Sequence, residues 1–249
     1  MEYIVASDIG RKRTVNEDRA IFIEREDAYK IAIVADGMGG HNAGDIASGM
    51  AVSGFEQLFL QADAEAFQST ELKKEWLLAS VQELNESIYQ YSLSHENCHG
   101  MGTTLIAVLI DAGECIICHI GDSRVYFSTA TNLQLITRDH SYVNVLVDNG
   151  EISEEEAESH PKKNYIIKSL GTEATIAPDF YSVQFVSDSY LLVCSDGLSN
   201  KLTKQEMQAI IHLPLPIQEK GDQLIQLANE HGGEDNISLI LFADNMKEV

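Results

Sequence analysis

The chain has 249 residues, 44% of them hydrophobic, and its 39 Asp and Glu outnumber its 17 Lys and Arg to give a net charge of −22. That length and apolar content suit one large domain with a sizeable core, and no Pro-, Ser- or Gly-rich linker divides the chain. A surface so acidic repels nucleic acid and anionic membranes, so neither is an expected partner. The sequence lacks an apolar run of about 18 residues and a signal peptide, so it predicts a cytoplasmic protein.

The four cysteines do not suggest a disulfide framework in a chain of this length. Cys115 and Cys118 form a C-x-x-C pair, which is also typical of redox and zinc sites. They lie in a run with strand character, where residues three apart point to opposite faces. Buried thiols are therefore the better interpretation.

The first part of the chain predicts three strands followed by two helices. The strands are expected at residues 3–7, 19–24 and 31–35, and a polar turn near 25–28 joins the last two as a hairpin. Apolar residues spaced three and four apart then predict helices with buried stripes over 43–58 and 72–91.

The second part returns to strands and ends in mixed structure. Strands are expected at 103–110, 114–120, 124–128 and 133–137, and the short turns between them favour an antiparallel meander. Residues 139–171 are polar and partly helical, with a capping box at Ser153. Further elements are strands at 181–186 and 190–194, helices from Thr203 and at 218–229, and a strand at 236–242. This order predicts an α+β fold with antiparallel sheets.

Acidic residues recur at the ends of the predicted strands. The turns are Asn16-Glu17-Asp18, Asp36-Gly37, Gly121-Asp122-Ser123, Asp196-Gly197 and Asp235-Asn236. Each one alone is ordinary turn chemistry, because Gly takes positive φ and Asp bonds its own backbone. Together they can converge at one sheet edge, and carboxylates are preferred ligands of Mg²⁺ and Mn²⁺. We therefore expect Asp36, Asp196 and Asp235 to hold divalent ions, with the Gly37 carbonyl able to approach closely.

Arg13 precedes the first of these turns. A guanidinium binds phosphate in a planar, two-pronged way. Taken alone, Arg13 is better explained as a solvated surface cation. Beside an acidic metal site, it is the group that a phosphoester hydrolase requires.

The ordered motifs resemble those of the metal-dependent type 2C Ser/Thr protein phosphatases, over about residues 8–241. The motifs are Arg13-x-x-Asn16-Glu17-Asp18, Val34-Ala35-Asp36-Gly37-Met38-Gly39-Gly40, Gly102-Thr103-Thr104, Gly121-Asp122-Ser123-Arg124, Ser195-Asp196-Gly197 and Asp235-Asn236. The Gly-Met-Gly-Gly-His form and Asp139-His140-Ser141 are most similar to the bacterial branch. The resemblance implies two packed antiparallel sheets flanked by helices on both sides, an αββα sandwich. It also implies a single phosphatase domain over 1–249, with a mobile flap at about 144–171.

The resemblance further implies two Mn²⁺ or Mg²⁺ ions, with a third bound weakly. Asp36 would bridge the two ions, Asp196 and Asp235 would complete the first, and the Gly37 carbonyl would serve the second. Glu17 and Asp18 would contact the second ion through water. Asp122 would bind the third ion together with Asp196. Arg13 would bind the substrate phosphate. A hydroxide bridging the two metal ions would attack phosphorus directly, without a phosphoenzyme.

One position departs from the eukaryotic pattern. Those relatives place a His, proposed as general acid, where this chain has Met38. His41 is close by and could act as the acid through water, cap the following helix or point to solvent. A metal-bound water could instead protonate the leaving group.

The expected activity is hydrolysis of phosphoserine and phosphothreonine, in opposition to a bacterial Ser/Thr kinase. Partners implied by resemblance are that kinase and its phosphorylated substrates, and a monomer is the default assembly. A phosphatase dedicated to one regulatory phosphoserine partner fits equally well. The alternative from another class is a catalytically silent module that binds a cation or partner.

Overall fold

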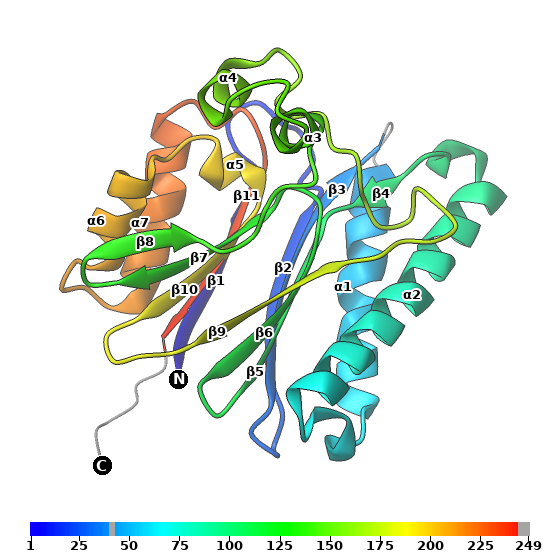
Figure 1. Ribbon diagram of the computed structural model, residues 1–249, viewed down its shortest axis with the longest axis horizontal. Coiled ribbons are helices and arrows are strands. Elements are labelled where there is room, and N and C mark those ends of the chain that lie inside the picture. Colours follow the sequence, from blue (N-terminus) through cyan, green and yellow to red (C-terminus); the bar gives the residue numbers. More distant parts are fainter. Residues whose placement is uncertain (40–42, 244–249) are drawn as a thin grey trace.

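The central strands are apolar on both faces, which places two sheets in the middle of the molecule. β3 (Lys30–Met38), β5 (Leu105–Asp111) and β6 (Glu114–Ile120) are buried over almost their full length. Successive side chains point to opposite faces, so such strands need cover on both sides. The computed structural model describes residues 1–39 and 43–243, and it has two sheets face to face with helices outside each (Figure 1). The predicted αββα sandwich is confirmed.

All strand pairs within the two sheets are antiparallel. The first sheet has the order β1 (Glu2–Asp8), β11 (Ile237–Ala243), β10 (Tyr190–Cys194), β7 (Arg124–Thr129) and β8 (Asn132–Leu135). The second has the order β2 (Asp18–Glu24), β3, β5, β6 and β9 (Asp179–Gln184), and the short β4 (Gly102–Thr103) pairs with β3. The hairpin predicted between the second and third strands is present as β2 and β3.

Helices cover the outer face of each sheet. The second sheet packs against α1 (Ala43–Gln61) and α2 (Thr70–Ser94), with the short 3₁₀ turns η1 (Ala64–Phe67) and η2 (Glu96–Cys98) nearby. The first sheet packs against α5 (Asp196–Ser199), α6 (Lys204–Ile211) and α7 (Ile217–Glu230). The helices α3 (Tyr142–Asp148) and α4 (Glu154–Ser159) lie together beyond one end of the sandwich (Figure 1).

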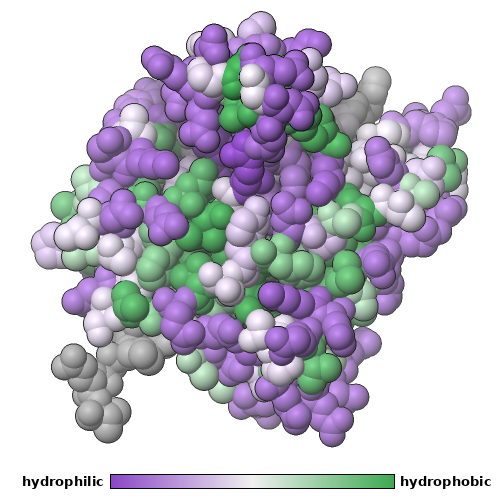
Figure 2. Space-filling view, in the orientation of Figure 1, coloured by the Kyte–Doolittle hydropathy of each residue, from purple (hydrophilic) through white to green (hydrophobic). Residues whose placement is uncertain are grey.

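Three apolar layers hold this arrangement together. The central layer lies between the sheets and includes Phe22, Ile117, Val193 and Phe242. The outer layers lie beneath α1 and α2 on one side and beneath α6 and α7 on the other. Figure 2 shows hydrophilic side chains over the end that carries α3 and α4, and apolar ones over the middle of that face. Within the described chain, no helix is long and apolar enough to cross a membrane.

The predicted meander is wrong, because the chain changes sheets after β6. The strands β5 and β6 pair in the second sheet, whereas β7 and β8 pair in the first. The crossing turn contains Gly121 at φ +105°, a backbone conformation that favours glycine. The strand expected over 103–110 is also divided at Thr104, where the Asp36 backbone donates to the Thr104 side-chain oxygen at 2.9 Å.

Helix starts are explained by local side chains. Ser153 and Thr203 each form a complete capping box, with Glu156 and Glu206 respectively, as the spacing predicts. The helix α3 lies within the stretch expected to be partly helical, although its seven residues were not delimited from the sequence. It begins after Ser141, whose side chain accepts a hydrogen bond from the backbone of Asn144.

The cysteines behave as buried thiols. Cys115 lies in the layer between the sheets and Cys118 in the layer beneath α1 and α2. These are the opposite faces of β6, as the strand geometry predicts. All four cysteines are buried, and none forms a disulfide.

Candidate active site

The acidic turns meet at one end of the sandwich. In the strand register Asp18 lies opposite Asp36, and Asp8 lies opposite Ile237, just after Asp235. Asp196 follows β10, and Asp122 lies in the turn that enters β7, which pairs with β10. The charges of Asp18, Asp196, Asp122 and Asp235 all act on Asp36. Five segments that are far apart in sequence therefore form one acidic cluster, as expected from strand ends.

The Asp36 segment depends on two glycines in close contact. A Cβ placed on Gly37 would lie 2.1 Å from the carbonyl oxygen of Gly44, at the start of α1. The backbone of Gly37 donates to the Glu17 carbonyl at 3.1 Å, and Ser48 Oγ donates to that same carbonyl at 2.6 Å. No larger residue fits at position 37, so the packing of this segment against the start of α1 requires glycine.

Ser195 joins the two sheets within the cluster. Its Oγ donates to Asp18 Oδ2 at 2.7 Å and accepts from the Ser238 backbone at 3.0 Å. Asp18 is 2% exposed, and its other carboxylate oxygen has no hydrogen-bond partner among the described residues. A buried oxygen without a partner is costly unless something else, such as a cation or water, satisfies it.

Asn236 organises the loop that carries Arg13. Its Nδ2 donates to the carbonyls of Ile9 and Val15 at 2.9 and 3.0 Å, and its Oδ1 accepts from the Glu17 backbone at 2.8 Å. A Cβ on Gly197 would lie 1.9 Å from the Asn236 carbonyl, so these motifs are pressed together. The sequence places Asn236 in a motif without assigning it a role. The structure shows that it connects β11 to the loop before β2.

Burial and mutual repulsion disturb the titration of these acids. The pKa of Asp36 is raised well above its usual range, first by burial and then by the charges of Asp18 and Asp196. Burial raises the pKa of Asp18 to about 7, although Ser195 lowers it. Burial and the charge of Asp235 raise the pKa of Asp196 to about 6, although a hydrogen bond with Asp36 lowers it. Close carboxylates of this kind repel one another unless a cation lies between them.

The donor set fits hard divalent cations. It consists of carboxylates with a backbone carbonyl beside them, and Mg²⁺ and Mn²⁺ prefer such oxygen ligands, often retaining several waters. In the present side-chain conformations, the described residues contain no group of three or more His, Cys, Asp or Glu arranged to hold an ion. The fit therefore rests on the repulsion among the carboxylates and the orphaned oxygens, and not on a preformed cage.

Arg13 lies at this cluster and is not an isolated surface cation. Its Nη2 is 2.9 Å from each carboxylate oxygen of Asp235, and its side chain is 47% exposed. Burial lowers the pKa of Arg13, but Asp235 and then Glu17 raise it further, so the net pKa is raised. The group remains charged and open to solvent beside the acids. His41 lies outside the described residues, and Met38 ends β3 opposite Gly102.

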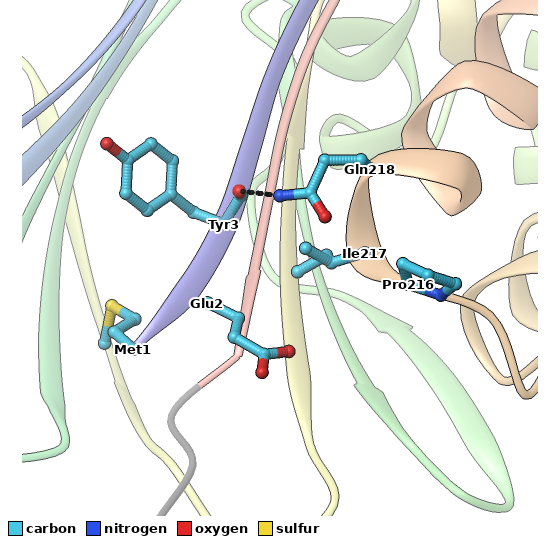
Figure 3. A pocket seen from close by; sticks show the side chains of 6 residues that line it. All are labelled: Met1, Glu2, Tyr3, Pro216, Ile217 and Gln218. Atoms are coloured by element: carbon cyan, nitrogen blue, oxygen red, sulfur yellow. Dashed lines mark hydrogen bonds between the residues drawn. The ribbon is translucent and has the colours of Figure 1, made fainter.

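A separate open pocket lies at the other end of β1. Its lining residues are Met1, Glu2, Tyr3, Pro216, Ile217 and Gln218 (Figure 3). Glu2 is opposite Ala243 in the strand register, at the far end from Asp8. Glu2 supplies the only side-chain carboxylate among these lining residues, so the pocket lacks the converging carboxylates of the acidic cluster.

The family model described as Protein phosphatase 2C matches residues 9–241. The chain belongs to the protein phosphatase 2C family. It is 40% identical over 242 residues to the serine/threonine phosphatase stp of Listeria welshimeri, covering 97% of this chain and 95% of that protein. It is therefore a serine/threonine protein phosphatase of the bacterial type, and the predicted family is confirmed.

Solved structures agree with this assignment. The serine/threonine phosphatase of S. agalactiae superposes with a TM-score of 0.92 and 37% identity, covering 98% of this chain and 99% of that one. The catalytic domain of the phosphatase PstP, solved in complex with two manganese ions, has a TM-score of 0.81 and 31% identity, with 96% of each chain covered. This 2C-type phosphatase therefore shares its fold with a protein that binds two Mn²⁺ ions.

Proposed function

We propose that this phosphatase hydrolyses phosphoserine and phosphothreonine by means of two divalent cations held in its acidic cluster. The observation that carries the proposal is the convergence of Asp36, Asp196 and Asp235, with pKa values of Asp36 and Asp196 raised by burial and by other carboxylates. The two manganese ions of the PstP structure support the same number and kind of ion. Mn²⁺ and Mg²⁺ both suit these ligands.

Each acidic residue has a distinct place in this proposal. Asp36 would be a ligand of both ions, because it is the carboxylate on which the charges of four other acids of the cluster act. Asp196 and Asp235 hold the first ion, and the Gly37 carbonyl holds the second. Glu17 and Asp18 act on the second ion through water. Asp122 and Asp196 hold a third, weaker ion.

The bound ions supply a water activated for attack on phosphorus and positive charge opposite the phosphoryl oxygens. Arg13 binds the substrate phosphate, since its guanidinium is exposed and already directed at the carboxylate of Asp235. A substrate phosphate can replace that carboxylate as the partner of the guanidinium. We assign no general acid among the described residues. His41, the candidate from the sequence, lies outside them.

The proposed partners are phosphorylated proteins, including a Ser/Thr kinase whose action this enzyme reverses. Residues 144–171, which contain α4 and part of α3, are proposed as the flap beside the active site. In Figure 1 these helices lie over the same end of the sandwich as the acidic turns.

Turnover of a phosphothreonine peptide with Mn²⁺ tests this function. We expect the wild-type protein to release phosphate and an Asp36→Ala/Asp235→Ala double variant to be at least about 100-fold slower, since even outer ligand partners contribute ~10–100-fold. An Asp27→Ala variant is a matched control, because Asp27 pairs with Arg25 in the β2–β3 turn. Equal turnover by the wild type and the double variant would refute the two-ion mechanism.

A further inference from the structure

Asp122 depends on its own backbone for its position. The residue is 7% exposed, and its Oδ1 has no hydrogen-bond partner among the described residues. Burial, followed by the charge of Asp196, raises its pKa. Because no other side chain of the described residues bonds to Oδ1, the backbone of Asp122 determines the position of the carboxylate. Whatever holds the Gly121–Asp122 peptide therefore also places this carboxylate.

His140 holds the two peptide groups that flank Gly121: its ring holds the amide of the Ile120–Gly121 peptide, and its backbone holds the carbonyl of the Gly121–Asp122 peptide. The Gly121 backbone donates to His140 Nδ1 at 3.0 Å, and the His140 backbone donates to the Gly121 carbonyl at 2.8 Å. Gly121 has φ +105°, and a Cβ there would lie 2.6 Å from the Thr104 side chain. The turn is therefore clamped between Thr104 and His140, with no room for another residue type.

The His140 ring is itself fixed in one tautomer. Because Nδ1 accepts the hydrogen bond from the Gly121 backbone, the ring proton of neutral His140 is on Nε2, which lies 3.2 Å from Asp179 Oδ2 on β9 and 3.3 Å from Lys168 Nζ. One face of the ring stacks on His119 at 4.9 Å between centroids. His119 Nε2 lies 3.0 Å from the Ser123 carbonyl, on the other side of Asp122. A chain of contacts thus runs from Asp179 through His140 to the turn that carries Asp122.

Both ends of the proposed flap reach this chain of contacts. His140 lies four positions before the first residue of the flap, and its carbonyl accepts from the Ile167 backbone at 2.9 Å. Lys168 Nζ lies 3.6 Å from Asp179 Oδ1. The segments that begin and end the flap therefore meet at the side chain that clamps Gly121.

We infer that His140 is a positioning residue that sets the Asp122 carboxylate through the Gly121 peptide, with Asp179 fixing its tautomer. The inference rests on the proposed cation role of Asp122. Because His140 also joins the two ends of the flap, a change in the flap can be transmitted to Asp122 through one hydrogen bond. The bound cation there is a hard divalent ion such as Mn²⁺.

Three substitutions at His140 separate positioning from mere packing. In His140→Asn the amide oxygen occupies the place of Nδ1 and retains the acceptor for Gly121. In His140→Gln the polar group lies near the place of Nε2, and in His140→Ala the acceptor is removed. We expect the Mn²⁺ concentration for half-maximal turnover of a phosphothreonine peptide to rise about tenfold in the Ala and Gln variants. The Asn variant should remain within about twofold of the wild type.

The Gly121 amide gives a second readout that needs no metal. In the metal-free protein, its ¹⁵N–¹H resonance should shift and exchange faster with solvent in the Ala and Gln variants, and remain near the wild type in the Asn variant. His212→Ala is the matched control, because His212 Nε2 bonds Ser128 Oγ at 2.9 Å, near the other end of β7. It should lower stability without changing either readout.

A double variant tests whether His140 acts through Asp122. In an Asp122→Asn background, His140→Ala should add nothing to the Mn²⁺ requirement, because the residue it positions no longer binds the ion. The inference would be overturned if the effects of the two substitutions on the Mn²⁺ requirement multiplied. It would also be overturned if His140→Gln kept the wild-type Mn²⁺ requirement as well as His140→Asn does. An unchanged Gly121 resonance in His140→Ala would refute the clamp itself. If Asp122→Asn alone leaves the Mn²⁺ requirement unchanged, the cation role of Asp122 fails, and with it the functional part of the inference.

Discussion

The two ends of strands β5 and β6 carry the same kind of residue in opposite electrostatic settings. At the hairpin end, Asp111 and Glu114 both bond the buried Lys73, at 2.9 and 3.0 Å. The hydrogen bond from Lys73 lowers the pKa of Glu114. At the other end, burial and then the charge of Asp196 raise the pKa of Asp122.

The difference shows which acids have a cationic partner within the chain. The carboxylates at the hairpin end have their cation supplied by α2. Those at the site end raise one another's pKa, and Arg13 meets the outermost of them, Asp235. An acidic turn is therefore structural at one end and a candidate cation ligand at the other.

The comparison predicts its largest effect for Asp36→Asn. Removing the bridging carboxylate should lower turnover of a phosphothreonine peptide with Mn²⁺ by at least about 100-fold. The matched change at the hairpin end, Asp111→Asn, should leave turnover within about twofold while lowering thermal stability. Similar turnover by both variants would remove the distinction between the two ends.

Arg13→Ala should have the next largest effect. A hydrogen bond to a charged group contributes roughly 1.5–3 kcal/mol, so kcat/KM should fall about 10- to 100-fold. The stability change should be under about 0.5 kcal/mol, because the ion pair with Asp235 is exposed. The neighbouring Lys12→Ala serves as the control in steady-state kinetics. An equal loss in both variants would indicate general attraction of phosphate and not a specific contact.

Lys73→Met tests the hairpin end. The change leaves two carboxylates without their buried cation and should lower the free energy of unfolding by about 2 kcal/mol. This is below the ~3–5 kcal/mol of a fully buried pair, because Asp111 and Glu114 are 33% and 29% exposed. Urea unfolding measures it, with Lys74→Met on the same helix as control. Unchanged stability would show that these acids need no internal cation.

The smallest effect concerns pH. Asp18 has a folded pKa of about 7, raised by burial from 3.8. The stability linked to such a group is present below its unfolded pKa and is lost as pH rises through its folded pKa. In EDTA, the free energy of unfolding should therefore fall between about pH 4 and pH 7, by at least about 1 kcal/mol. Asp18→Asn should flatten this slope. An equally steep slope in that variant would show that other groups cause the pH dependence.

Strand periodicity was sufficient to predict much of the fold and the place of the acids. Asp36 lies near the end of the apolar strand β3, Asp122 and Asp196 follow apolar strands, and Asp235 precedes one, so antiparallel pairing brings all four to the same end. The motif order then identified the family.

Contacts between distant segments were beyond sequence reasoning. The change of sheet after β6 depends on Gly121 packing against Thr104, which local propensity does not encode. Likewise, the bond from Ser195 to Asp18 joins residues 177 positions apart. His140 stood in a family motif, yet its contact with Gly121 required the fold.

Calorimetric titration of the metal-free protein with Mn²⁺ at neutral pH tests the central claim most directly. We predict binding of two ions per chain, with a third at higher concentration, and loss of the tight sites in the Asp36→Asn variant. Undiminished tight binding in that variant, or no binding by the wild type, would contradict the claim that the uncompensated carboxylates form a metal site.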